Sequence, residues 1–261
     1  MKKIISKKIQ IKAKIKYIFF ILIVVFFCFY FIENNENVDI AMNKYTLNND
    51  GICILFNRDY ATKTIDYPSD NLKKDILEKL PNGYLFINYV YKIENSTLST
   101  FHRDVTSSKH IYKTTYPVYT AILYKYSGEL LSFCPGSNLT YPFVWSRISN
   151  ISGDSGSVFV FDSDILHAGC DNNCYISREV LQYKICHKDD LEKLRSLSGV
   201  YIIKTETLCN HSIFNNILRK TSYYFEMPIN TILYPLMIKR ENPDNIIGKL
   251  QEYIPISFYN N

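Results

Sequence analysis

The spacing of two histidines and one aspartate is the feature that most constrains how this chain can fold. His102 and Asp104 form a His-x-Asp pair, and His167 follows 63 residues after Asp104. In an extended strand, residues two apart point to the same face, so His102 and Asp104 can converge on one point while Arg103 points away. A distant strand must then deliver the third side chain. Residues 158–161 form a short apolar run, typical of a buried strand, that leads toward His167.

These residue types indicate a metal site. Two imidazoles and one carboxylate on one face of an iron ion leave three coordination positions open, as in the non-haem Fe(II) oxygenases. A 2-oxo acid can chelate through two of these positions, and O2 can take the third. Arg178 lies 11 residues beyond His167 and opens an alternating run that ends at Cys186. Its planar guanidinium suits a carboxylate better than a lysine would.

The ordered set of motifs resembles the 2-oxoglutarate/Fe(II)-dependent dioxygenase superfamily, most of all its phytanoyl-CoA dioxygenase-like branch. The resemblance covers about residues 85–190, and it is carried by His102-Arg103-Asp104, residues 128–137 with their Pro-Gly-Ser turn, residues 156–167, and Arg178. Strands that carry ligands, with helices around them, favour the α+β class. The resemblance makes this a double-stranded β-helix, or jelly roll, with flanking helices.

The resemblance also implies roles for the residues. Fe(II) would be held by His102, Asp104 and His167, and Arg178 would bind the distal carboxylate of 2-oxoglutarate. Decarboxylation of 2-oxoglutarate with O2 would yield succinate and CO2 and drive hydroxylation of a C–H bond, with ascorbate as a further candidate cofactor. Val180 stands where the family often places a small hydroxyl residue that helps to hold the co-substrate. The substrate is not readable: a polypeptide side chain and a lipid or small molecule both stay open.

The N-terminal segment predicts a membrane anchor. Residues 1–16 contain seven lysines and no acid, and residues 17–32 contain no charge. Sixteen residues are slightly short for a span, but flanking lysines can extend toward the headgroups. No small-x-small cleavage site follows, so an uncleaved signal-anchor is favoured over a cleaved signal peptide. The lysine block should stay cytoplasmic, which predicts a single-pass type II protein with a luminal or extracytoplasmic domain.

The charge balance excludes one class of partner. Without the seven N-terminal lysines, 23 basic and 25 acidic residues remain, so the folded part shows no basic footprint for nucleic acid. The basic tail fits anionic membrane lipid instead. The predicted organisation is a cytoplasmic tail (1–16), a span (17–32), a polar Asn-rich stalk (33–50) and one jelly-roll domain (51–261).

Local patterns predict several elements of that domain. Apolar spacing after Ser69 indicates a helix over residues 69–80, and further helices are expected at 189–197 and 245–254. β-branched and aromatic residues indicate strands at 84–93 and 118–126. Cys170 and Cys174 straddle a short loop after His167, which a disulfide would staple in an oxidising compartment.

Two other classes of function are consistent with parts of the sequence. One is a catalytically inactive jelly roll that serves as a type II membrane scaffold or binding protein. The other is a luminal glycosyltransferase, which shares the anchor and stalk and would use Asp162-Ser163-Asp164 as an Asp-x-Asp motif. No strand–helix–strand succession surrounds that motif, and Asp164 is expected to shape a turn instead. His110, His187 and His211 are expected to be structural or surface residues.

Overall fold

The computed structural model describes residues 14–24, 35–42, 44–62, 65–95, 100–104, 107–141, 144, 146–170, 178–205 and 213–224. The chain divides into two compact units, Met1–Asn35 and Glu36–Asn261. In the first unit, residues 14–24 form a helix with exposed side chains. Across the described residues, no helix combines the length and the apolar character that a membrane crossing requires. The expected span at 17–32 continues past residue 24 into residues outside that description, so the anchor stays a prediction.

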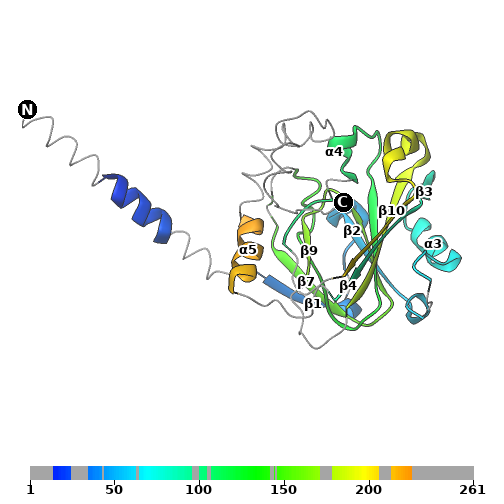
Figure 1. Cartoon of the computed structure of the whole chain (residues 1–261), viewed down its shortest axis with the longest axis horizontal. Helices are drawn as coiled ribbons and strands as arrows, with labels where there is room; N and C mark the ends of the chain where they lie inside the picture. The colour runs from blue at the N-terminus through cyan, green and yellow to red at the C-terminus, as the bar shows by residue number, and fades with distance from the viewer. Residues whose placement is uncertain are drawn as a thin grey trace, which may run out of the picture. The chain divides into compact units, whose positions relative to one another are not determined.

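The second unit is a β-rich α+β fold in which two sheets enclose a hydrophobic core (Figure 1). The smaller sheet has the strand order β1-β7-β6-β9. Its strands are β1 (Asn35–Asp39), β6 (Gly128–Phe133), β7 (Ile148–Gly153) and β9 (His167–Gly169). The expected α+β class is confirmed, and the double-stranded β-helix stays a prediction from the sequence resemblance.

The larger sheet has the order β11-β4-β10-β5-β8-β2, with β3 also paired to β10. Its pairings are antiparallel except for β11, which runs parallel to β4. Its strands are β2 (Ile52–Phe56), β3 (Tyr84–Phe86), β4 (Tyr89–Glu94), β5 (Tyr119–Tyr124), β8 (Ser157–Asp162), β10 (Glu179–His187) and β11 (Val200–Thr205). The predicted strand at 118–126 is therefore confirmed as β5, whereas the run at 84–93 is divided into β3 and β4.

Helices and 3-10 turns surround the sheets. They are η1 (Ile40–Met42), α2 (Leu47–Asp50), η2 (Arg58–Tyr60), α3 (Asp70–Leu77), α4 (Lys109–Tyr112), η4 (Lys188–Leu197) and α5 (Ile213–Tyr224). The predicted helix after Ser69 is confirmed as α3, whose first turn is capped by the Ser69 hydroxyl accepting from Leu72 N at 3.3 Å. The segment predicted as a helix at 189–197 is a 3-10 helix with a kink at Leu194. The helix predicted at 245–254 lies outside the described residues.

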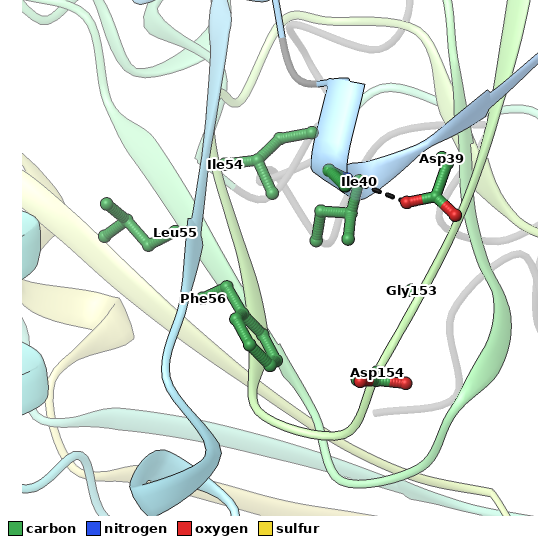
Figure 2. A pocket seen from close by; sticks show the side chains of 8 residues that line it. Asp39, Ile40, Ile54, Leu55, Phe56, Gly153 and Asp154 are labelled. Atoms are coloured by element: carbon green, nitrogen blue, oxygen red, sulfur yellow. Dashed lines mark hydrogen bonds between the residues drawn. The ribbon is translucent and has the colours of Figure 1, made fainter.

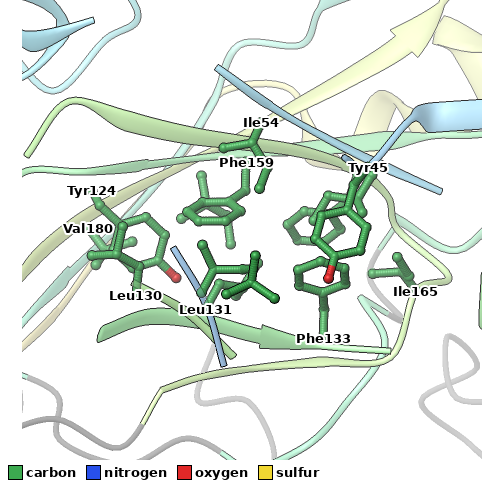
Figure 3. Close-up of a cluster of buried hydrophobic side chains, with 14 of the residues drawn as sticks. Tyr45, Ile54, Tyr124, Leu130, Leu131, Phe133, Phe159, Ile165 and Val180 are labelled. Carbon is green, nitrogen blue, oxygen red and sulfur yellow. The ribbon is translucent and has the colours of Figure 1, made fainter. Parts of the chain in front are cut away.

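The central strands are buried on both faces, and alternate side chains enter different clusters. Tyr124 of β5 and Val180 of β10 face the core between the sheets (Figure 3), and Ile122 of β5 belongs to the same cluster. Ala121 and Leu123 face the opposite side and pack with α3. This two-sided burial follows from the near-continuous apolar sequence of these strands. Ile122, Tyr124 and Val180 thus show that even-numbered positions of β5 and β10 share the face that is turned to the core between the sheets.

The structure corrects the predicted stalk. Residues expected to form a polar linker at 33–50 include β1, η1 and α2, and Val38 and Tyr45 are buried in the core between the sheets. The Tyr45 hydroxyl donates to Ser149 Oγ at 2.9 Å, and its ring packs edge-on against Phe133. The Asn-rich composition concealed a few widely spaced apolar residues, which suffice to complete the smaller sheet. The folded domain therefore begins before residue 51.

Candidate metal centre

The His-x-Asp segment is held in place by backbone pairing with the strand that carries His167. His102 N donates to His167 O at 2.9 Å, and His167 N donates to His102 O at 3.0 Å, which forms an isolated β-bridge. Asp104 N donates to Ser163 O at 2.8 Å. The sequence predicted a strand at His102 to Asp104, but the backbone pairing of this segment is limited to the single bridge between His102 and His167. An extended segment still projects residues 102 and 104 to one side, so the consequence for the ligands is unchanged.

His167 lies on its own short strand. The apolar run 158–161 belongs to β8 of the larger sheet, and a turn at Ser163 and Asp164 then carries the chain across to β9 of the smaller sheet. The expectation that His167 ends the same strand as that run was therefore wrong. Because His167 and His102 are directly bridged, their imidazole centroids lie 4.5 Å apart.

The three predicted ligands converge. His102 Nε2 lies 3.9 Å from Asp104 Oδ1, and His167 Nε2 lies 3.8 Å from the same oxygen. One ligand atom from each residue lies within 4.8 Å of the others, so the group could hold a metal ion. Asp104 and His167 are buried, whereas the His102 side chain is 31% exposed. The cluster therefore lies at the boundary between the core and solvent.

The backbone prepares both imidazoles for a metal. His102 Nδ1 lies 2.8 Å from Thr100 O, and His167 Nδ1 lies 3.1 Å from Ile165 O. A carbonyl accepts only from N–H, so Nδ1 carries a proton in each ring, and in the neutral form of the ring Nε2 then presents a lone pair toward Asp104. Burial, followed by the neighbouring His102, lowers the pKa of His167 to about 3. His167 is therefore neutral near pH 7, which is the form that binds metals.

Asp104 uses its two oxygens differently. Oδ1 faces the imidazoles, while Oδ2 accepts from Thr120 Oγ1 at 2.5 Å, Lys184 Nζ at 2.7 Å and Gln182 Nε2 at 3.1 Å. Burial acts to raise the pKa of Asp104, but Lys184, His167 and His102 together hold that pKa well below its usual range. Asp104 is therefore a carboxylate. One carboxylate with two imidazoles is the donor set that non-haem Fe(II) sites use.

Arg178 lies farther along the same interior face. It directly precedes β10 and shares the parity of Val180, Gln182 and Lys184. Six residues of extended strand separate Arg178 from Lys184, or roughly 20 Å along the strand. The guanidinium is buried; Nε donates to Tyr126 Oη at 2.8 Å, and Nη1 and Nη2 make long contacts of 3.4 and 3.5 Å with Cys170 O and Leu130 O. Arg178 thus does not join the three ligands, but it places a cation inside the same core.

Four polar residues around these groups were not singled out from the sequence. Thr120, Gln182 and Lys184 surround Asp104, and Tyr126 contacts Arg178. A signal for two of them was present, because Gln182 and Lys184 occupy alternate positions of an otherwise apolar strand run and share the parity of Arg178. Polar residues repeated with period two inside a buried strand indicate a polar interior row.

The two acids that flank the turn before His167 have structural roles. Asp162 Oδ1 accepts from Asp164 N at 3.0 Å, so Asp162, rather than Asp164 as expected, shapes the turn. Asp164 accepts from the Ser108 hydroxyl, and Asn138 Nδ2 donates to Asp162 at 3.1 Å. Burial and the neighbouring Asp162 raise the pKa of Asp164 to about 7. Both acids are enclosed by mainly antiparallel sheets, which is not the setting of a nucleotide-sugar Asp-x-Asp motif.

Two of the other three histidines can be placed. His110 stacks on Tyr141 with a centroid distance of 4.0 Å, and the His187 ring lies tilted against the Tyr116 ring with a centroid distance of 3.9 Å. His211 lies outside the described residues. Cys170 carries a thiol whose sulfur lies 3.2 Å from Ser132 Oγ. Cys174, its expected disulfide partner, lies outside the described residues.

A separate cavity of about 390 Å³ lies at the far end of β8 from the ligands (Figure 2). Phe56 of β2 pairs with Ser157 at the start of β8, whereas Asp104 contacts Ser163 just beyond the other end of that strand. The cavity is lined by Asp39, Ile40, Ala41, Ile54, Leu55, Phe56, Gly153 and Asp154. It contains none of the predicted site residues.

Comparisons with known proteins concern the fold. No protein-family model and no curated protein sequence matches this chain. The chain is similar in structure to SnoN, the non-haem α-ketoglutarate-dependent epimerase from nogalamycin biosynthesis, with a TM-score of 0.42 and 11% identity over 64% of this chain and 92% of SnoN. It is also similar to HygX from Streptomyces hygroscopicus, solved with nickel and 2-oxoglutarate bound, with a TM-score of 0.40 and 10% identity over 54% of this chain and 84% of HygX. A third similar structure is EvdMO1, with a TM-score of 0.37 and 13% identity. That match covers 46% of this chain and only 31% of EvdMO1.

Proposed function

We propose that this protein is a non-haem Fe(II)- and 2-oxoglutarate-dependent dioxygenase that hydroxylates a C–H bond. The observation that carries the proposal is the convergence of two Nε2 atoms and one carboxylate oxygen, with both Nδ1 atoms tied to backbone carbonyls. His102, Asp104 and His167 would hold Fe(II). When bound, the iron supplies activation of O2, coupled to decarboxylation of 2-oxoglutarate to succinate and CO2. Three protein ligands leave positions open for these reactants.

The chain's own residues would orient the co-substrate and exclude water. Arg178 supplies a buried cation on the interior face, where the distal carboxylate of 2-oxoglutarate would otherwise be an unpaired buried charge. Tyr126, whose hydroxyl contacts Arg178, can supply the hydroxyl that Val180 lacks. The Phe161 ring lies 4.5 Å from the His167 ring and keeps one side of the centre apolar. Ascorbate would serve as an auxiliary reductant.

Three finer assignments are proposals that rest on the sequence. These are membership of the phytanoyl-CoA dioxygenase-like branch, a signal-anchor at residues 17–32 that contacts membrane lipid, and a luminal or extracytoplasmic catalytic domain. The motif order supports the first, and the lysine block next to an apolar run supports the other two. A luminal domain would favour a prolyl or lysyl side chain as substrate, whereas the branch would favour a lipid or small molecule. Nucleic acid is not an expected partner.

The test combines metal content with turnover that needs no substrate. Purified protein is loaded anaerobically with Fe(II), and succinate release from 2-oxoglutarate is then measured with O2 and ascorbate. His102→Ala, Asp104→Ala and His167→Ala should each lose most bound iron and all succinate release, because two ligands cannot maintain the same geometry. His187→Ala is the control, since it removes a buried histidine that contacts Tyr116 rather than the ligands and should retain both signals. Stoichiometric iron and full turnover in the three ligand variants would refute the site; iron binding without turnover in the wild type would favour an inactive scaffold.

A further inference from the structure

Lys184 is a lysine with no exposed side-chain surface in the middle of a central strand. Its Nζ lies 2.7 Å from Asp104 Oδ2 and 2.8 Å from Thr120 Oγ1, and 5.9 Å from the centroid of the Tyr89 ring. A buried ammonium is costly unless it is paired and hydrogen-bonded, and here the carboxylate is the partner. The ion pair joins the proposed metal ligand to β10 across 80 residues of sequence.

The lysine does not occupy the place of a metal ion. It contacts Oδ2 together with Thr120 and Gln182, whereas Oδ1 is the oxygen that faces the two imidazoles. Oδ2 of Asp104 thus accepts hydrogen bonds from the protein, while Oδ1 is directed toward the two imidazoles. Three donors on Oδ2 disfavour its turning toward an ion, because they would each lose their acceptor inside the core.

We propose that Lys184 is a positioning residue that acts as the internal counter-ion of Asp104. It balances the buried carboxylate while the centre is empty, and it limits Asp104 to one coordinating oxygen when a metal binds. Restriction to one oxygen keeps a coordination position open for the other reactants. The inference rests on the proposed metal site but not on the identity of the co-substrate.

The proposal predicts a specific link between stability and metal. In the wild type, Asp104 has a counter-charge whether or not a metal is bound. In Lys184→Met, which keeps the length and volume of the side chain, Asp104 has a counter-charge only when a metal is bound. A divalent ion should therefore raise the melting temperature of Lys184→Met more than that of the wild type, with a difference on the order of 10 °C.

The experiment measures thermal unfolding of chelator-treated protein with and without Co2+. Lys184→Gln is the second variant, because it retains a hydrogen-bond donor but no charge. Lys92→Met is the matched control: it removes a mostly buried lysine from the same sheet, whose partners are Asp66, Glu94 and Glu179 rather than the triad. The double variant Asp104→Asn/Lys184→Met removes both charges. It should be more stable than Lys184→Met without metal and should not respond to Co2+.

The outcomes separate this inference from the proposed function. If the wild type does not bind Co2+, both fail. Co2+ could instead raise the melting temperatures of the wild type, Lys184→Met and Lys92→Met equally, or the double variant could be no more stable than Lys184→Met without metal. In either case Lys184 is a packing residue, and only this inference fails. Insolubility of both Lys184 variants even when metal is supplied during expression would overturn it as well. The Co2+ absorption spectrum should also change in Lys184→Met, because Oδ2 then keeps only the donors from Thr120 and Gln182 and can turn toward the ion; an unchanged spectrum would refute the role of Lys184 in limiting Asp104 to one oxygen.

Discussion

Replacement of Arg178 by leucine provides the sharpest test of the co-substrate assignment. Metal binding needs the three ligands but no arginine, so Arg178→Leu should retain iron. A dicarboxylate that chelates the metal through its keto-acid end needs a cation for its far carboxylate in a buried core. Arg178 is 5% exposed, and the contacts of its Nη atoms with Cys170 O and Leu130 O are long.

The expected loss is large. Removing the charged partner of a buried carboxylate commonly costs roughly 2–5 kcal/mol, or about 30- to 4000-fold in affinity. Arg178→Lys should fall between the wild type and Arg178→Leu, because a point charge retains attraction but lacks the planar fork. Arg178→Leu also removes the donor to Tyr126 Oη, which should lower the free energy of unfolding by about 1–3 kcal/mol. Stability must therefore be measured beside affinity.

The assay is an anaerobic titration of 2-oxoglutarate that follows the absorption band of the Fe(II) chelate. Arg219→Leu is the matched control, because Arg219 of α5 donates to Gly169 O at 2.6 Å and to Ser132 Oγ at 2.7 Å near the same strands. This control should lose stability and keep its affinity for 2-oxoglutarate. If Arg178→Leu binds 2-oxoglutarate like the wild type, the arginine is structural and the co-substrate either lies elsewhere or is a different acid.

Two further predictions concern pH and topology. The pKa of the Asp164 carboxyl is raised to about 7, so the folded protein binds the proton of this carboxyl more tightly than the unfolded chain does. The charged carboxylate therefore destabilises the fold above pH 7, and this destabilisation fades as the pH falls toward 4. Asp164→Asn should be more stable than the wild type at pH 8, by up to about 4 kcal/mol, and this advantage should disappear near pH 4. Urea unfolding of both proteins between pH 4 and pH 8 is the measurement. A constant difference in the free energy of unfolding across this range would contradict the reasoning. The lysine block predicts that residues 50–261 resist protease added outside sealed microsomes, and their digestion there would overturn the luminal assignment.

The sequence by itself selected the three residues that the fold brings together as candidate metal ligands. His102, Asp104 and His167 could be selected because few residue types bind iron and because alternate residues of an extended segment share a face. The strands β5, β8 and β10 and the helix α3 could be recognised for a similar reason. Their apolar periodicity and the Ser69 cap are local properties that a linear pattern contains.

Local patterns failed where the structure depends on a few distant contacts. The Asn-rich residues before position 51 looked like a linker, yet Val38 and Tyr45 bury themselves against the smaller sheet. The His-x-Asp segment looked like a full strand, yet only one bridge pairs it with His167. Neither outcome follows from composition, because each depends on whether a partner strand is available alongside.

Only the tertiary structure decided what surrounds the ligands. The register of β10 against β5 sets Lys184 opposite Thr120, and both side chains then reach Asp104 from separations of 80 and 16 residues. A shift of one residue in that register would turn Lys184 and Gln182 to the outer face and bring apolar neighbours inward. Register is fixed by the packing of the whole core. The sequence could therefore indicate which side chains could hold a metal, but the lysine that pairs with Asp104 became apparent only in the fold.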